Sequence, residues 1–255
     1  MTVIFESGYT LPSGDEPLTH ARIAHSLNWL SGGTAVASTT ATGFFADGPL
    51  NSLTYELWKP SSVAATWEYD HASSATDQDY CAIAAHNLGT SGSTVKVQYY
   101  TGSVWSDLCA ATAIADDSPI LVIFEPTTAQ RWRINITATT SNPTVGVVKF
   151  GQALQISQPL YGGHSPINLA RQTQLRSNYS ETGEFLGRTK QRSIFSNSFS
   201  WTHLKASWIR SNWPTLQKAI ESEPFWIAWR PSDYGEVGYG QTDQVPIPQN
   251  MGLKD

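Results

Sequence analysis

The stretch from Tyr80 to Leu154 decides the fold, because it consists of closely spaced segments with the composition of β-strands. They read YCAIAAHNLG (80–89), TVKVQYYTGSVWSDL (94–108), ILVIFEP (120–126), RWRINIT (131–137) and VGVVKFGQAL (145–154). Each is short, rich in Val, Ile and aromatic residues, and bounded by Gly, Ser, Thr, Asn or Pro, which is typical of an antiparallel β-sandwich. Such a scaffold presents loops at its ends and carries no sign of a reaction centre. The pattern therefore favours binding and assembly over catalysis.

The bulk composition is that of a folded protein with one large domain or two small ones. Of the 255 residues, 40% are hydrophobic and 15% are charged, and the net charge is −5. This charge argues against non-specific nucleic-acid binding, which depends on a basic surface. The charge is also uneven: residues 1–155 hold 6 Lys/Arg and 13 Asp/Glu, and residues 156–255 hold 10 and 8, which sum to the 16 and 21 of the whole chain. The asymmetry suits two modules that face different partners, although a difference without functional meaning is equally compatible with it.

Two cysteines, Cys81 and Cys109, are too few for a disulfide framework and are predicted to be free thiols. The N-terminal segment MTVIFESGYTLPSGDEP has no basic region followed by a long apolar run, so no signal peptide is expected. No segment approaches the ~20 apolar residues of a membrane-spanning helix. We therefore expect a soluble protein that is made in the cytoplasm and does not insert into a membrane.

The segments before the strand-rich stretch are less regular. Residues 20–30 (HARIAHSLNWL) fit a strand or a short helix, and the sequence does not decide between them. Between residues 32 and 70, the segments AVAST, LTYELWKP and ATWEYD are predicted to be short strands joined by long connections.

The best candidate for a domain boundary lies in QALQISQPLYGGHSP (152–166), where Pro and Gly accumulate. We place a β-sandwich in residues 1–156 and a smaller β-domain in residues 157–255. Within the second domain, the alternation around Glu181-Thr182-Gly183 predicts a β-hairpin with Gly in its turn. A single α-helix is predicted over about 204–221, with a kink or a break at Pro214. The segment PFWIAWRP (224–231) is predicted to be an aromatic strand.

Residues that could carry chemistry are sparse. No phosphate-binding loop, dinucleotide fingerprint, nucleophile elbow or metal-spaced Cys/His cluster occurs, so no catalytic residue, metal or cofactor is predicted. The acidic pairs Asp77/Asp79 and Asp116/Asp117 could act as the catalytic pair of a glycosidase or as calcium ligands. Both pairs lie in predicted polar loops, where Asp commonly caps turns. His86 could contact a ligand at a loop edge, or it could be a partly buried histidine bonded to the main chain.

Aromatic residues give the strongest hint of a binding surface. Most aromatic residues in a sandwich are core, and Trp67 and Trp132 are predicted to be packed inside. Trp105 lies in the hairpin TGSVWSDL and is the better candidate for an exposed stacking surface. Arg131 and Arg133 flank Trp132 and should point to the opposite face of their strand. There they would pair with Glu68 and Asp70 across strands, or they would bind an acidic ligand.

Several of these segments, taken in order, resemble the discoidin-like, galactose-binding-like domains. The resemblance covers roughly residues 20–155 and rests on VAST (36–39), LWKP, ATWEYD, YCAIAAHNLG, TVKVQYYTGSVWSDL, RWRINIT and VGVVKFGQAL. It implies a jelly-roll sandwich that frequently binds carbohydrate through loops at one end. This chain departs from the family in having no disulfide that closes the domain and no clear calcium loop. The ligand-binding candidates on this interpretation are Trp105, His86, Tyr99 and Asn87.

The C-terminal part resembles tail proteins of tailed bacteriophages. The segments SNYSETGEFLGRTK, PFWIAWRP and YGEVGYGQTD, together with the single helix, are similar to the small β-domains of distal and minor tail proteins. This resemblance covers about 90 residues and implies assembly into a ring around the tail tube or its tip.

Together these features predict an all-β chain: a galactose-binding-like jelly-roll sandwich plus a smaller β-domain with one α-helix. The predicted function is a non-catalytic structural component of a phage-like virion tail, near its tip. Its expected partners are other phage tail proteins and further copies of itself in a ring-forming homo-oligomer, with host-surface glycans as a further partner of the sandwich. The expected location is the virion tail, after synthesis in the host cytoplasm. The alternative is a carbohydrate-binding module of a polysaccharide-processing system.

Overall fold

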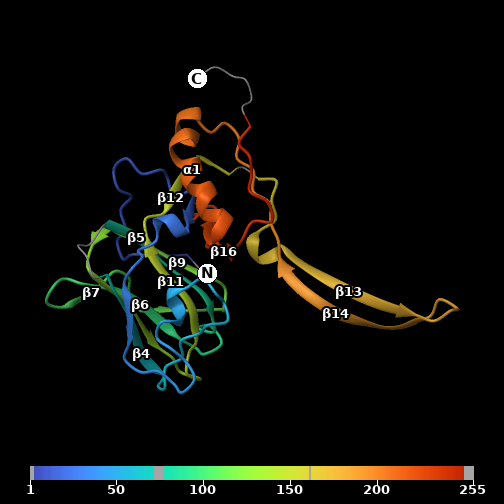
Figure 1. Ribbon diagram of the computed structural model, residues 1–255, viewed down its shortest axis with the longest axis horizontal. Helices are drawn as coiled ribbons and strands as arrows, with labels where there is room; N and C mark the ends of the chain where they lie inside the picture. Colours follow the sequence, from blue (N-terminus) through green and yellow to red (C-terminus); the bar gives the residue numbers. More distant parts are fainter. Residues whose placement is uncertain (1–2, 72–76, 161, 250–255) are drawn as a thin grey trace.

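A computed structural model describes residues 3–71, 77–160 and 162–249 of the chain. Figure 1 shows a layered body of β-sheets, a helix on one side of the body, and a long hairpin that projects away from it. The architecture is predominantly β, with one α-helix among the described residues, as the sequence predicts. None of the helices in the described ranges is long and apolar enough to cross a lipid bilayer.

Two facing sheets form the sandwich. Their strand orders are β1-β9-β5-β11 and β3-β4-β10-β6-β7, with β8 paired to β6. The first sheet contains β1 (Val3–Phe5), β5 (Asp77–His86), β9 (Ile120–Thr128) and β11 (Val145–Gly151). The second contains β3 (Thr34–Ala37), β4 (Ala64–Asp70), β6 (Thr94–Tyr100), β7 (Trp105–Asp107), β8 (Thr112–Ala113) and β10 (Arg131–Thr137). All pairings are antiparallel except that of β1 with β9.

The sandwich core lies between these two sheets. It contains the fully buried Trp67 and Trp132, as predicted, and Trp132 packs against Phe124 and Phe150 with ring centroids 5.9 and 5.5 Å apart. The strands of the second sheet alternate between buried and less buried residues, because their outer face is free. Cys81 and Cys109 are buried free thiols in this core, which confirms the prediction.

A third sheet covers the other face of the first sheet, β1-β9-β5-β11. It has the order β12-β2-β15-β16, with β2 (His20–Ala24), β12 (Leu154–Pro159), β15 (Phe225–Ala228) and β16 (Val237–Gly240). A second core, which includes Tyr80, Leu121 and Trp226, fills the space between the two sheets. Burial on both faces explains why every residue of β11 is buried and why β9 begins with five consecutive buried residues.

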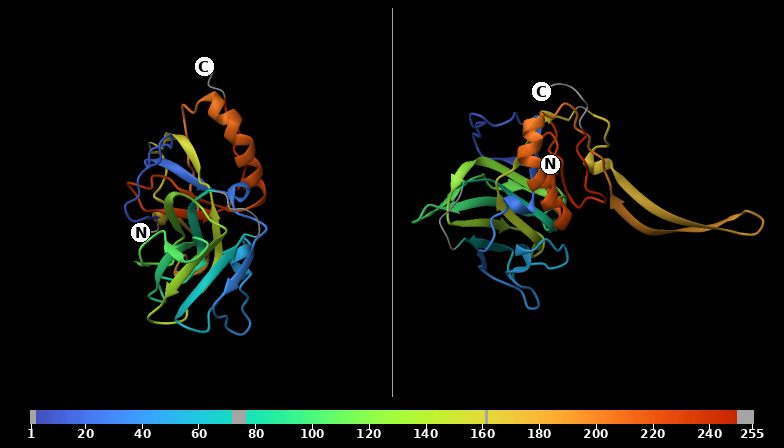
Figure 2. Two further views of the ribbon diagram at one scale, coloured as in Figure 1. Left: turned by 90° about the vertical axis from the view of Figure 1, so that its left-hand side faces the viewer. Right: turned by 45° about the horizontal axis from the view of Figure 1, so that its top comes forward.

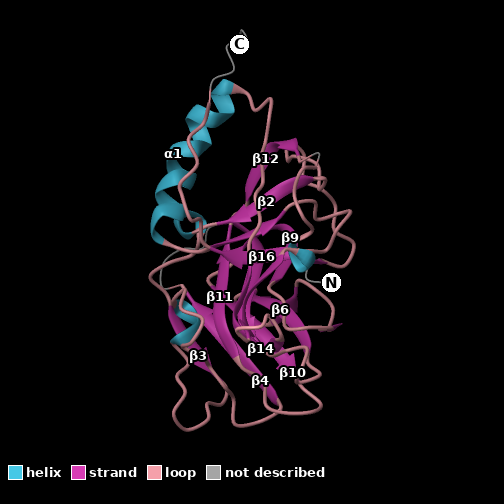
Figure 3. Cartoon of the chain, turned by 90° about the vertical axis from the view of Figure 1, so that its right-hand side faces the viewer, coloured by secondary structure: helices cyan, strands magenta, loops and turns pink. Residues whose placement is uncertain are grey.

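The helix α1 (Ala206–Ser222) packs on the outer side of the third sheet through Leu216 and Ile220 (Figure 3). The sheet combines β2 and β12, from the first part of the chain, with β15 and β16 from the last. The predicted boundary at residues 156/157 falls inside β12, and strands from both sides of it pair in this sheet. The division into two domains stays a prediction.

The hairpin of β13 (Arg171–Tyr179) and β14 (Phe185–Phe195) forms a separate two-stranded sheet that projects from the body (Figures 1 and 2). We call residues 171–195 the arm. Its turn confirms the predicted hairpin: Gly183 has φ +87°, and the main-chain N–H of Ser180 donates to Glu184 O at 2.8 Å. Nearly every side chain of the arm is exposed, which distinguishes it from the rest of the fold.

Two local expectations were wrong and one open question is resolved. The segment 53–60 is not a strand; its buried Trp58 makes a single isolated bridge to Val145, and the indole N–H donates to Thr39 O at 3.0 Å. The alternative of a break at Pro214 is also wrong, because one helix runs through it. Residues 20–30 form strand β2 followed by a 3-10 turn at Ser26–Asn28.

Candidate functional site

The outer face of the six-stranded sheet carries an aromatic and arginine cluster around Trp105. The hairpin of β6 and β7 places Trp105 directly opposite Tyr100, with ring centroids 5.3 Å apart. The guanidinium of Arg133 lies 4.2 Å from the Trp105 ring centroid, and that of Arg131 lies 4.9 Å from Tyr100. Both cations are therefore within the range of cation–π attraction. We call Tyr100, Trp105, Arg131 and Arg133 the outer-face cluster.

Carboxylates and amides hold the arginines of this cluster in place. Arg131 pairs with Glu68 at 2.8 Å and with Asp70 at 3.8 Å, and Arg133 Nη1 lies 3.7 Å from Glu68. These contacts confirm the predicted cross-strand ion pairs. Arg133 Nε also donates to Gln98 Oε1 at 2.6 Å. The arginines are thus fixed over the aromatic rings, in an arrangement that can stack on a flat ligand and donate hydrogen bonds at its rim.

A neighbouring charge pair completes this face. Asp107 accepts hydrogen bonds from Lys96 and Gln98, and the bond from Lys96 is the main reason that the pKa of Asp107 is lowered. Asp107 is therefore ionised at neutral pH. The outer face therefore carries both positive and negative side chains, and neither sign of charge dominates it.

The predicted ligand-binding residues do not come together in one place. Tyr99 points toward the sandwich core, whereas Trp105 lies on the outer face of the sheet. Tyr99 packs against Trp132, with ring centroids 6.4 Å apart. His86 and Asn87 lie at the end of β5, where His86 Nε2 is 2.8 Å from Ser118 O and His86 Nδ1 accepts the Leu88 N–H at 3.2 Å. Burial lowers the pKa of His86, which keeps its ring neutral.

Asn87 and the acidic pairs also have defined local partners. The main-chain N–H of Thr144 donates to Asn87 Oδ1 at 2.6 Å. Asp116 accepts the Ser118 N–H at 2.9 Å, and Asp117 accepts from the main chain and hydroxyl of Thr90. These groups behave as turn-capping residues. Their arrangement matches the structural interpretation of His86 and of the Asp116/Asp117 pair.

The sequence predicted Trp105 as a ligand-binding residue but did not predict that Tyr100 lies beside it. A signal for Tyr100 was present: Gly102 marks the turn of TGSVW, and residues at equal distances from a turn face each other across a hairpin. The arginines were identified, but their position over the Trp105 ring depends on β10 lying beside β6, which the local pattern does not specify.

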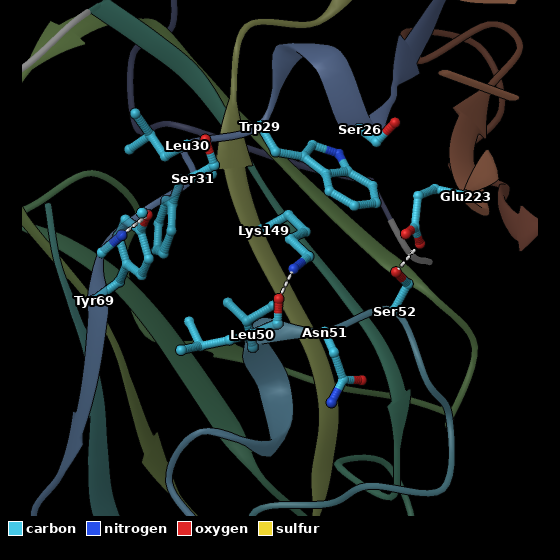
Figure 4. A pocket seen from close by; sticks show the side chains of 14 residues that line it. Ser26, Trp29, Leu30, Ser31, Leu50, Asn51, Ser52, Tyr69, Lys149 and Glu223 are labelled. Carbon is cyan, nitrogen blue, oxygen red and sulfur yellow. Dashed lines mark hydrogen bonds between the residues drawn. The ribbon is translucent and has the colours of Figure 1, made fainter. Parts of the chain in front are cut away.

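A pocket lies where the sandwich meets the third sheet and the end of α1 (Figure 4). We call it the junction pocket; its volume is about 320 Å³. Lys149 Nζ donates to Leu50 O and lies 4.9 Å from the ring centroid of Trp29. Ser52 Oγ donates to Glu223, the residue that follows α1. Desolvation lowers the pKa of Lys149 to about 8, opposed by the charge of Glu223. These contacts tie the end of the helix to the sandwich.

Within residues 3–71, 77–160 and 162–249, no group of three or more His, Cys, Asp or Glu side chains is arranged to hold a metal ion. Asp79, one of the predicted acidic residues, accepts the Ala153 N–H at 2.8 Å, and burial raises its pKa to about 7.

Comparison with known proteins finds likeness in structure and none in sequence. No family profile matches the chain, and no curated protein matches it. A pectin-binding carbohydrate-binding module is 15% identical with a TM-score of 0.41, over 46% of this chain and 88% of the module. The family 32 module from C. perfringens NanJ, solved with galactose, is 14% identical with a TM-score of 0.43, over 48% and 97%. A chitosan-binding module from a Paenibacillus sp. IK-5 chitosanase/glucanase is 18% identical with a TM-score of 0.41, over 48% and 97%.

The matching chains also include catalytic proteins. A Ruminococcus gnavus fucosidase, solved with fucose, is 15% identical with a TM-score of 0.41, and the match covers 48% of this chain but 26% of the enzyme. Each of these matches spans about half of the present chain. The strand orders and the shared core described above establish the fold: this chain is a mostly-β protein built around a β-sandwich.

Proposed function

We propose that this chain is a non-catalytic structural subunit of a multi-copy assembly, and that the assembly is a phage-like virion tail. The observation that carries the proposal is the arm. It extends roughly 35 Å from the body, given about 3.3 Å for each residue of a strand. A two-stranded hairpin without a core of its own is marginally stable in water. An arm of this kind gains stability when it lies against another subunit.

The exposed side chains of the arm support this role. Leu175, Phe185 and Phe195 are 48%, 58% and 62% exposed, although their side chains are apolar. Apolar groups that gather on a projecting element mark an interaction surface more often than a solvent-facing one. The choice of a phage-like tail as the assembly follows the resemblance that the sequence of the hairpin, the helix and the segments PFWIAWRP and YGEVGYGQTD predicts.

Imaging of labelled particles tests the proposal. A chain that carries a small affinity tag is produced in a host that makes the virion, and purified particles are stained with gold-labelled antibody. Label on the tail supports the proposal, and particles without label contradict it. As a control, a chain in which a short Gly-Ser linker replaces residues 172–194 should be produced but not incorporated. The linker is short because the Ser196 N–H donates to Ala170 O at 3.0 Å, so the two ends of the arm are adjacent.

A second candidate function is carbohydrate recognition by the outer-face cluster. The observation that favours it is the pairing of Tyr100 and Trp105 beside two fixed guanidinium groups, because aromatic rings next to fixed hydrogen-bond donors suit sugar rings. A glycan array probed with the full chain tests it. Binding should fall at least tenfold in Trp105→Ala and stay unchanged in Tyr55→Ala, which removes an exposed aromatic ring on another loop. Absence of binding to every glycan, or equal loss in both variants, contradicts this candidate.

A further inference from the structure

One face of the arm combines cations with apolar groups and has no acidic side chain. Residues paired across an antiparallel hairpin point to the same side, so the register assigns each residue to a face. The first face, which we call the basic face, consists of Arg171, Thr173, Leu175, Ser177, Tyr179, Phe185, Arg188, Lys190, Ser193 and Phe195. Hydrogen bonds confirm the assignment, since Arg171 Nε and Arg188 Nε donate to Ser193 and Ser177 on the same face.

The cations of this face have no acidic partner. None of the ion pairs among the described residues includes Arg171, Arg188 or Lys190. Arg188 instead lies 5.9 Å from the Phe185 ring centroid, which in turn contacts Tyr179 at 5.8 Å. The basic face is therefore a strip of unpaired positive charge between exposed aromatic rings, which fits an acidic surface with some apolar character.

The body carries such a surface around Tyr9. The loop between β1 and β2 meets the end of β9 here, because Glu125 accepts the Thr10 N–H at 3.1 Å and Glu6 accepts the Glu125 N–H at 2.8 Å. Burial raises the pKa of Tyr9, and the negative charges of Asp15 and Glu125 raise it further. We call Glu6, Tyr9, Asp15 and Glu125 the acidic surface.

The charge of one cation, Arg22, acts on Tyr9 and Asp15, but this side chain is buried. Arg22 is 2% exposed and donates hydrogen bonds to the main-chain oxygens of Glu16 and His20. Among the described residues, no Lys or Arg forms an ion pair with Glu6, Asp15 or Glu125. The excess of acidic residues in positions 1–155 is thus partly concentrated beside an aromatic side chain.

The arm and the acidic surface lie on opposite sides of the body. The loop between β1 and β2, dark blue in Figures 1 and 2, lies on the side away from the projecting hairpin. The arm therefore cannot reach the acidic surface of its own chain, whereas the arm of a second copy can. Complementary patches on opposite sides of one subunit produce head-to-tail contacts, which close into a ring or continue as a filament.

We propose that the basic face of the arm binds the acidic surface of a second copy of this chain, in a head-to-tail array. The inference rests on the proposed assembly function and names the partner and the acceptor residues. Burial of Leu175, Phe185 and Phe195 against the neighbouring copy supplies apolar contact, and the unpaired cations select the acidic side of that copy. Each subunit donates one arm and accepts another.

The mass of the purified full chain in solution tests this proposal. Light scattering coupled to size exclusion should show oligomers at about 50 mM NaCl that dissociate toward monomers near 500 mM, because salt screens exposed charge pairs. The triple variant Arg171→Glu/Arg188→Glu/Lys190→Glu should weaken association at least tenfold. The control Arg176→Glu/Arg192→Glu reverses the two cations on the other face of the arm and should associate as the unmodified chain does.

The acceptor side is tested by neutralisation without loss of hydrogen-bond acceptors. Glu6→Gln/Asp15→Asn/Glu125→Gln keeps an oxygen at each position and should weaken association to a similar extent. Asp15→Lys/Glu125→Lys mixed with the triple arm variant should restore association that neither forms alone. Unfolding temperatures of all variants establish that they are folded.

Three results would overturn the inference. They are a monomeric unmodified chain at both salt concentrations, equal association in the acceptor variant, and arm-dependent binding of a fluorescent single-stranded oligonucleotide, which would assign the basic face to nucleic acid. None of these affects the labelling of particles. A chain that is found on the tail but is monomeric when pure therefore refutes self-association alone, and an unlabelled particle refutes the proposed function.

Discussion

The sandwich and the arm are built from strands of similar length but have opposite relations to solvent. Trp132 in β10 is fully buried among aromatic rings, and every residue of β11 is buried. In the arm, β13 and β14 pair with each other alone and leave Leu175 and Phe195 exposed. Pairing with a neighbouring strand gives a hairpin its shape, whereas burial of one of its faces makes it stable. The arm has paired strands but no buried face, so we expect its stability to depend on contact with a partner.

The largest effect should follow from removal of a core ring. We expect Trp132→Ala to lower the free energy of unfolding by about 3–5 kcal/mol, because it leaves a cavity between Phe124 and Phe150. Urea denaturation measures the change. Tyr55→Ala, at an exposed position, should change it by less than about 0.5 kcal/mol. Similar values for the two variants would contradict the description of the core.

A pH-dependent effect should follow from Asp79→Asn. Burial raises the pKa of Asp79 to about 7 from an ordinary 3.8, so the folded state binds more protons than the unfolded state between these values. The contribution of Asp79 to stability is therefore largest near pH 4 and falls as the pH rises to 7, by at most about 4 kcal/mol. The variant should equal the unmodified chain near pH 4 and become more stable than it near pH 7.

Chemical denaturation at several pH values measures this difference. Burial also lowers the pKa of His25 to about 4, and its contribution to stability rises with pH over a similar range. Subtraction of the two curves at each pH removes the His25 contribution, which is common to both chains. Parallel curves for the variant and the unmodified chain would refute the prediction for Asp79.

A smaller effect is expected where α1 meets the sandwich. Glu223→Ala removes the acceptor of the Ser52 hydroxyl and the charge that favours protonated Lys149. We expect a loss of about 1–2 kcal/mol in the free energy of unfolding at neutral pH. Glu221→Ala is the control, because Glu221 lies two residues earlier, in the last turn of α1, and its exposed side chain accepts a hydrogen bond from Gln217 at 3.2 Å. An equal loss in the two variants would show that the junction contributes nothing specific.

The smallest effect on folding should come from the arm. Leu175→Ser replaces an exposed side chain and should change the free energy of unfolding of the monomer by less than about 0.5 kcal/mol. If the arm binds a second copy, the same substitution weakens self-association several-fold, which light scattering measures. A large loss of monomer stability would show instead that Leu175 packs against its own chain.

The sequence predicted the strands better than it predicted the site. Strands β6, β10 and β11 fall within the segments quoted at the outset, and β5 and β9 overlap theirs, because composition and turn residues act locally. The prediction for segment 53–60 was wrong although residues 53–57 alternate between apolar and polar side chains as in a strand. The segment meets a sheet through one isolated bridge from Trp58 to Val145, and the indole N–H of the buried Trp58 donates to Thr39 O. The outer-face cluster depends on the pairing of β6 with β10, and non-local pairing leaves no trace in a single segment.

Local sequence was enough to predict a mostly-β protein, the places of its central strands, the burial of Trp67 and Trp132, and a hairpin within residues 171–195 with Gly183 in its turn. Each of these depends on periodicity or backbone conformation within a few residues. Three features could be seen only in the folded chain: the sheet β1-β9-β5-β11 is covered on both faces, β2 pairs with β15, and the arm projects from the body uncovered. These features depend on which faces meet, and contact between distant segments is set by the burial of the whole chain.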